Sequence, residues 1–195
     1  MKPFFFSYKS ITITWPMLLI IISVLISYLI VKLFLNEKDG DKGKIEDIFM
    51  WLLVTGFVGA RLGYVLININ LYKDNMTAIF KISYYNLSLV GGIVSGLLLL
   101  IIISKKYNIK FEKLLETFTV PFYFSMSIGV WIPIFDRTLI ASNHIRNSQS
   151  GALNLSTLFL LAMILELTLF KKLNNKYLRL LTLTLVIFIY KMKSF

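Results

Sequence analysis

The chain has 195 residues, of which 57% are hydrophobic and 16% charged, and its mean hydropathy is +0.74. This is more apolar than a soluble globular domain, and the absence of cysteine together with a single histidine excludes disulfides, thiol nucleophiles and Cys- or His-rich metal sites. The net charge is +11, and the basic residues lie between long apolar runs. This pattern indicates membrane topology and contact with anionic lipid headgroups, not binding of nucleic acid.

Six apolar stretches are candidate transmembrane helices, because crossing the hydrocarbon core takes about 20 mostly apolar residues. In chain order they cover about residues 11–35, 48–69, 84–103, 114–135, 153–170 and 177–190. The first is too long for a signal-peptide core and lacks a small-residue cleavage site, so we expect it to stay as an anchor. Since the connections are short, the sequence predicts an all-α fold. This would be a polytopic membrane helix bundle with about six transmembrane helices, forming a single membrane domain over residues 1–195.

Basic residues concentrate in the first, third and fifth connections. Residues 104–113 contain four lysines and residues 171–176 contain three. The positive-inside rule places these connections in the cytoplasm, so we expect an external N terminus. Glu116 and Glu166 lie near the cytoplasmic ends of their predicted helices and are interpreted as snorkelling to the membrane interface.

Arg61 lies well inside the second apolar stretch, where a charge is costly unless it meets a partner or water. On a helical wheel Gly56, Gly59 and Gly63 share one side, which lets a neighbouring helix approach closely. The roughly opposite side carries aromatic and polar residues: Phe57, Arg61, Tyr64 and Asn68. The glycine side is therefore predicted to pack against another helix, and the other side to line something polar.

Two partners for Arg61 stay open at this point. It could pair with Asp136, at the outer end of the fourth predicted helix, and so fix the order of the helices. Alternatively, its fork of N–H donors could hold the phosphate of a phospholipid. The third stretch has a small-residue face of its own, and only Asn86 on its other side can make polar contacts.

The run GFVGARLGYVL at residues 56–66 resembles the second-helix motif of bacterial prolipoprotein diacylglyceryl transferases. An acidic stretch precedes it, here residues 45–47. The family's Ser-Phe-His-Gly-Gly follows about twenty residues later, with its counterpart at residues 88–92. The similarity covers about residues 11–137. It implies a multi-pass protein of the bacterial plasma membrane that transfers diacylglyceryl from phosphatidylglycerol to a lipobox cysteine at the outer leaflet.

The resemblance also implies a lipid site in which Arg61 holds the phosphate, without metal or cofactor. The surrounding polar residues would be Tyr64, Asn86, Asp136 and Arg137. The expected partners are phosphatidylglycerol and a prolipoprotein signal peptide.

Several positions of the family's chemistry hold other residues here. The family's histidine falls on Val90, which cannot transfer a proton. In a later motif, the arginine position holds Trp131 and the two asparagine positions hold Ile134 and Arg137. Two hypotheses follow. The chain is either a divergent transferase or a non-catalytic relative, a pseudoenzyme that binds phospholipid or acts as a scaffold.

Overall fold

The computed structural model describes residues 4–8, 11–34, 42–73, 76–80, 86–135, 149–170 and 176–194. Within these ranges six helices have 17 residues or more, beside a short strand pair and a few single turns of helix, which confirms the predicted all-α class. The chain divides into two compact units. The first unit comprises Met1–Asn36 and Leu115–Phe195, and the second comprises Glu37–Leu114.

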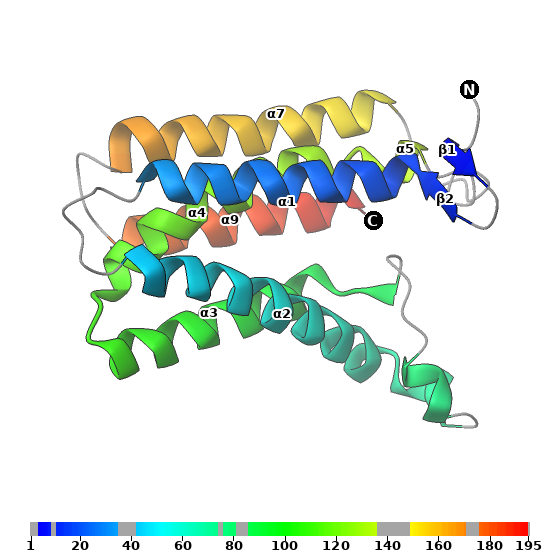
Figure 1. Cartoon of the computed structure of the whole chain (residues 1–195), viewed down its shortest axis with the longest axis horizontal. Coiled ribbons are helices and arrows are strands. Elements are labelled where there is room, and N and C mark those ends of the chain that lie inside the picture. The colour runs from blue at the N-terminus through cyan, green and yellow to red at the C-terminus, as the bar shows by residue number, and fades with distance from the viewer. Residues whose placement is uncertain are drawn as a thin grey trace. The chain divides into compact units, whose positions relative to one another are not determined.

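Four long helices build the first unit. Its elements are α1 (Trp15–Phe34), α4 (Phe111–Gly129, from Leu115 on), α5 (Ile132–Phe135), α7 (Gln149–Leu165), the π-helical turn η5 (Glu166–Phe170) and α9 (Lys176–Ser194). As Figure 1 shows, α1 and α7 run in one direction while α4 and α9 run in the other. The end of α7, the turn η5 and the start of α9 therefore lie at the same end of this unit.

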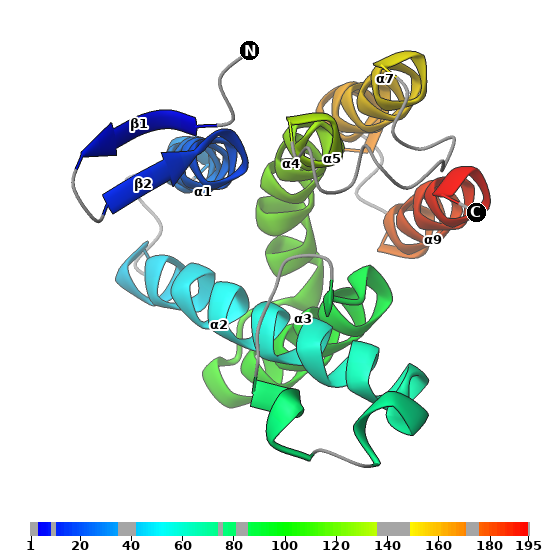
Figure 2. The ribbon, with the colours of Figure 1, turned by 90° about the vertical axis from the view of Figure 1, so that its right-hand side faces the viewer.

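A strand pair precedes α1. β1 (Phe4–Tyr8) and β2 (Ile11–Thr14) are antiparallel, and β2 contacts α1 (Figure 2). The first helix thus begins at Trp15, not at residue 11 as predicted. The reason is local, because the sequence Ile-Thr-Ile-Thr consists of β-branched residues that favour extended backbone. Pro16 then lies in the first turn of α1, where the missing N–H costs no helical hydrogen bond.

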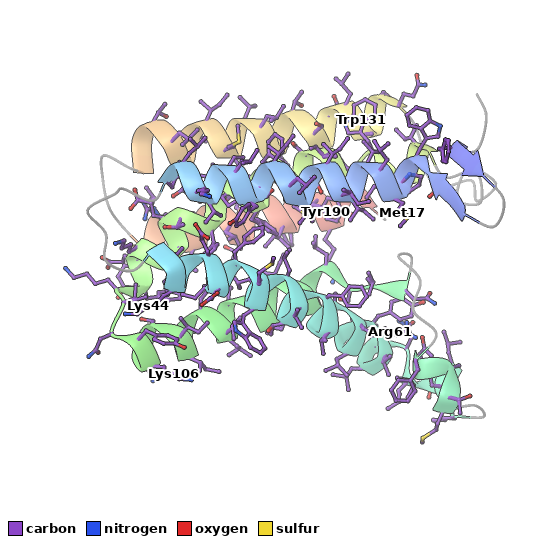
Figure 3. All side chains as sticks on the ribbon, viewed as in Figure 1. Met17, Lys44, Arg61, Lys106, Trp131 and Tyr190 are labelled. Atoms are coloured by element: carbon purple, nitrogen blue, oxygen red, sulfur yellow. The ribbon has the colours of Figure 1, made fainter. Side chains whose placement is uncertain are left out.

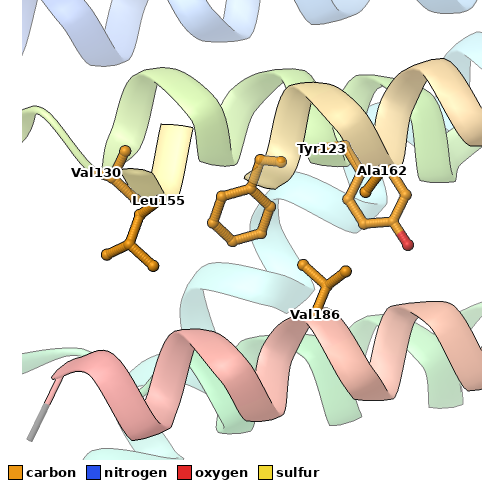
Figure 4. Close-up of a cluster of buried hydrophobic side chains, with 6 residues drawn as sticks. Tyr123, Val130, Leu155, Ala162 and Val186 are labelled. Atoms are coloured by element: carbon orange, nitrogen blue, oxygen red, sulfur yellow. The ribbon is translucent and has the colours of Figure 1, made fainter. Parts of the chain in front are cut away.

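The buried core of the first unit joins α4, α7 and α9 (Figure 4). Its buried members are Tyr123, Val130, Leu155, Phe159, Ala162 and Val186. On α1, Ser27 donates to the carbonyl of Pro121 and lies 2.7 Å from the hydroxyl of Ser125. These two contacts link α1 to the middle of α4.

The second unit is a close pair of helices with two short turns. Its elements are α2 (Lys42–Ile67), η1 (Ile69–Tyr72), η2 (Met76–Phe80) and α3 (Leu89–Tyr107). α2 begins six residues earlier than the predicted residue 48, and α3 begins at Leu89 instead of residue 84. Ser88 caps α3 by accepting a hydrogen bond from the N–H of Gly91, which fixes the start of that helix.

The glycine side of α2 packs directly on α3, as the sequence predicts. A Cβ added at Gly59 would meet the side chain of Ser95, and one added at Gly63 would lie 2.7 Å from the Cα of Gly91. Ser95 also donates to the carbonyl of Thr55 across the interface. Only residues without a side chain permit this approach of the two backbones.

Four of the described helices are long and apolar enough to cross a membrane: α1, Gly43–Ile67 of α2, α3, and Gln149–Thr168 spanning α7 and the start of η5. Large hydrophobic side chains stand exposed on all four, among them Leu29, Leu66, Leu98 and Leu161. Such surfaces suit lipid, not water, so this is a membrane protein. The other two predicted spans are helical, as α4 with α5 and as α9, but they are not among these four.

Candidate functional site

Arg61 is buried in the second unit, with 6% of its surface exposed. Its guanidinium donates to three backbone carbonyls. Nε donates to Ile79 at 2.9 Å, Nη1 to Asn86 at 3.0 Å and Nη2 to Ala78 at 3.0 Å. Figure 3 labels Arg61 on α2, near the end of that helix that leads to η1. One side chain thus connects α2 to η2 and to Asn86, three residues before the start of α3.

Two tyrosine rings lie near the guanidinium. The centroid of Tyr72 is 5.6 Å from its central carbon, and that of Tyr64 is 6.0 Å away. Tyr72 is itself buried at the end of η1. Cation–π attraction and the carbonyl dipoles together offset part of the cost of burying this charge.

The arrangement orients the guanidinium without removing its charge. Carbonyl oxygens carry only partial negative charge, so a guanidinium that they hold keeps its unit positive charge. In an apolar unit this charge acts over a longer range than it would in water. Guanidinium groups pair well with phosphate and carboxylate anions, because their fork of N–H donors matches two oxygens at once.

The structure brings together three of the residues predicted for the site. Tyr64 lies one helical turn from Arg61, as expected. Asn86 contributes its backbone carbonyl, although its side-chain amide was the predicted contact. Asp136 and Arg137 fall in 136–148, outside the described residues, so the proposed Arg61–Asp136 pair stays a prediction.

Three contacts of Arg61 were missed by the sequence reasoning. Tyr72 stands eleven residues after Arg61 and beyond the end of α2, so only its aromatic character at helical spacing could have marked it. The carbonyls of Ala78 and Ile79 carry no side-chain signal at all, because any residue there has the same acceptor.

Two residues, Val90 and Trp131, stand where the resemblance places a histidine and an arginine of the family. Val90 lies in the first turn of α3, and 44% of its surface is exposed. Trp131 follows α4 and packs against the core cluster of the first unit. Neither side chain can act as a general acid or base.

Comparison with known proteins assigns most of this chain to one group. A family model described as prolipoprotein diacylglyceryl transferase matches residues 3–140. A relative from Finegoldia magna is 32% identical over 126 residues, covering 65% of this chain and 51% of the relative. One from Clostridium kluyveri is 29% identical over 136 residues, covering 70% and 53%. One from Listeria innocua is 28% identical over 122 residues, covering 63% and 44%.

All three relatives are named phosphatidylglycerol–prolipoprotein diacylglyceryl transferase. The chain spans about half the length of the curated relatives it matches. The matched region contains Arg61 and both helices of the second unit, whereas α7, η5 and α9 follow it.

Proposed function

Because the chain belongs to the prolipoprotein diacylglyceryl transferase family, we propose that it binds phosphatidylglycerol in the membrane and transfers diacylglyceryl to a prolipoprotein cysteine. The observation that carries this proposal is Arg61, a buried cation that three backbone carbonyls orient inside the matched region. In this proposal Tyr64, Tyr72 and Asn86 lie around the lipid phosphate, and Asp136 and Arg137, outside the described residues, are the further residues that the sequence predicts for the site.

Arg61 serves the transfer through its charge. The thiol sulfur forms a bond to the glyceryl carbon, and the bond between that carbon and the phosphate oxygen breaks. Glycerol phosphate leaves with one more negative charge than the diester carried, and the proton of the thiol is released to water. A positive charge fixed beside the phosphate stabilises the leaving dianion more than the bound diester. It therefore lowers the activation barrier of the transfer.

A lipidation assay tests this function. The purified chain is incubated with phosphatidylglycerol vesicles and a lipobox peptide, and the peptide is read by mass spectrometry. We expect a mass increase of one diacylglyceryl group at the cysteine, with a full-length relative as positive control. An unshifted peptide beside an active control would contradict transfer.

A second candidate function is binding of phosphatidylglycerol without transfer. Val90 favours this second function. It stands where the family has a histidine, and unlike histidine a valine cannot transfer a proton. Native mass spectrometry separates the two candidates, because a binding protein retains the lipid while the peptide stays unmodified. If the protein is a slow transferase, the variant Val90→His should increase the rate of transfer to the peptide. If it only binds the lipid, the variant should still leave the peptide unmodified.

We further propose that the protein crosses the bacterial plasma membrane several times with its N terminus outside. Because the chain has no cysteine, single-cysteine variants give clean labelling with a membrane-impermeant maleimide. Phe6→Cys, on β1, is expected to react on intact cells. Tyr107→Cys, next to Lys106 at the end of α3, is expected to react only after permeabilisation. Both positions are exposed, at 51% and 43%, so the reversed pattern would overturn the orientation.

A further inference from the structure

Three charged side chains meet inside the first unit. Arg179 on α9 and Glu166 at the start of η5 are each 1% exposed in their side chains, and Nε of Arg179 lies 2.7 Å from Oε1 of Glu166. Glu116 on α4 approaches Nη1 of Arg179 to 3.6 Å, and its side chain is 31% exposed. We call these three residues the charged triad. The prediction that Glu166 snorkels to the interface is wrong, because Arg179 holds it inside the unit.

Three buried oxygens of this cluster make no hydrogen bond with described residues: both carboxylate oxygens of Glu166, of which Oε1 faces Nε of Arg179 as an ion pair, and the hydroxyl of Tyr123. Tyr123 comes from α4 and is 1% exposed. Thr182 of α9 is the side chain that faces it, but the Thr182 hydroxyl donates to the carbonyls of Leu178 and Arg179. An unsatisfied carboxylate oxygen therefore lies buried in the same cluster as an unsatisfied hydroxyl, which is costly as it stands.

The charges of the triad do not balance. With both carboxyls ionised the sum over Glu116, Glu166 and Arg179 is −1. In the part of the chain that the structure describes, Arg179 and Glu116 are the charged groups of α9 and α4 that act on Glu166. A net charge held in an apolar interior is unfavourable, and a buried carboxyl relieves it by taking up a proton.

We propose that the charged triad is a proton-binding site, which takes up one proton through the partly exposed Glu116 and holds it on Oε2 of Glu166. The proton neutralises the cluster and lets Glu166 keep its contact with Arg179 through Oε1. The site lies where the helix of α7 changes to a π-helical turn, a local geometry that often accompanies function. Glu166 and Arg179 follow the residues that the family model matches, whereas Glu116 lies within them.

Infrared spectroscopy of the full chain in lipid nanodiscs tests this proposal. A protonated carboxyl shows a carbonyl stretch that the ionised carboxylate lacks. We expect this band at neutral pH in the wild type and its loss in Glu166→Gln. The variant Glu116→Gln removes one negative charge, so the remaining Glu166–Arg179 pair is neutral without a proton. In that variant the band should appear only at a distinctly lower pH.

Glu46→Gln, a carboxyl on α2 in the other unit, is the matched control and should leave the band unchanged. Helical circular dichroism of each variant confirms that it is folded. Absence of the band in folded wild type at neutral pH would overturn the proposal and identify the triad as a static ion pair. A band that persists in Glu166→Gln, or does not move in Glu116→Gln, would overturn it equally.

Discussion

Replacing Gly91 by alanine is expected to destabilise the second unit by about 1–3 kcal/mol, the usual cost of overpacking a close interface. The new Cβ would lie 2.5 Å from the carbonyl oxygen of Gly59 and 2.9 Å from the Cα of Gly63. Both are backbone atoms of α2, so no side chain can rotate away. The helices must separate, and contacts along the whole interface weaken with them.

Gly96→Ala is the matched control for this substitution. Gly96 is on the same helix, but a Cβ there would meet only the flexible side chain of Leu52, at 3.7 Å. Alanine also favours helix over glycine by about 1 kcal/mol. In thermal unfolding of the detergent-solubilised protein, followed by helical circular dichroism, Gly91→Ala should melt lower than wild type and Gly96→Ala should melt equal or higher. Equal melting temperatures for both variants would show that the interface tolerates a methyl group at its closest point.

The same interface positions the candidate site. The N–H of Ser88, just before α3, donates to the carbonyl of Ala60 at 2.8 Å, and Asn86 two residues earlier accepts from Arg61. A shift of α3 away from α2 therefore moves one of the three carbonyls that orient the guanidinium. We expect Gly91→Ala to weaken lipid binding as well as stability, although it touches no residue of the site.

Helical periodicity was enough to predict the contact between α2 and α3. The wheel placed Gly59 and Gly63 on one side, and that side faces Gly91 in the structure. It was enough because the repeat of 3.6 residues fixes which side chains share a face before any partner is known. The same reasoning placed Arg61 and Tyr64 on a common side of α2.

Helical periodicity could not predict contacts that are made by backbone groups or by residues far away in the sequence. The three acceptors of Arg61 are carbonyls, which every residue type carries. The position of Glu166 was misjudged because its distance from the end of the predicted helix suggested access to water. Its burial depends on Arg179, which comes from a different helix. Residues 11–14 were predicted as helix because hydropathy alone does not separate a strand from the start of a membrane span.

Arg61→Ala should have the largest effect of any single substitution in the second unit. It leaves the partly buried carbonyls of Ala78, Ile79 and Asn86 without this donor, and each orphaned acceptor costs up to about 1–3 kcal/mol unless water replaces the guanidinium. Hydrogen exchange should show loss of protection in η2 and around residue 86. Phosphatidylglycerol affinity, measured by native mass spectrometry, should fall about tenfold to a hundredfold, as expected for losing charge-assisted hydrogen bonds.

Arg61→Lys separates the two roles of the guanidinium. Lysine keeps the positive charge, but its three donors radiate from one nitrogen and cannot reproduce a fork aimed at three carbonyls. We expect the loss of exchange protection to approach that of Arg61→Ala, while more lipid affinity is retained. Lys106→Ala removes an equal charge from the end of α3 and should change neither quantity. If Arg61→Ala bound phosphatidylglycerol as tightly as wild type, Arg61 would be only an anchor for η2, and the proposed lipid site would have to be sought elsewhere in the chain.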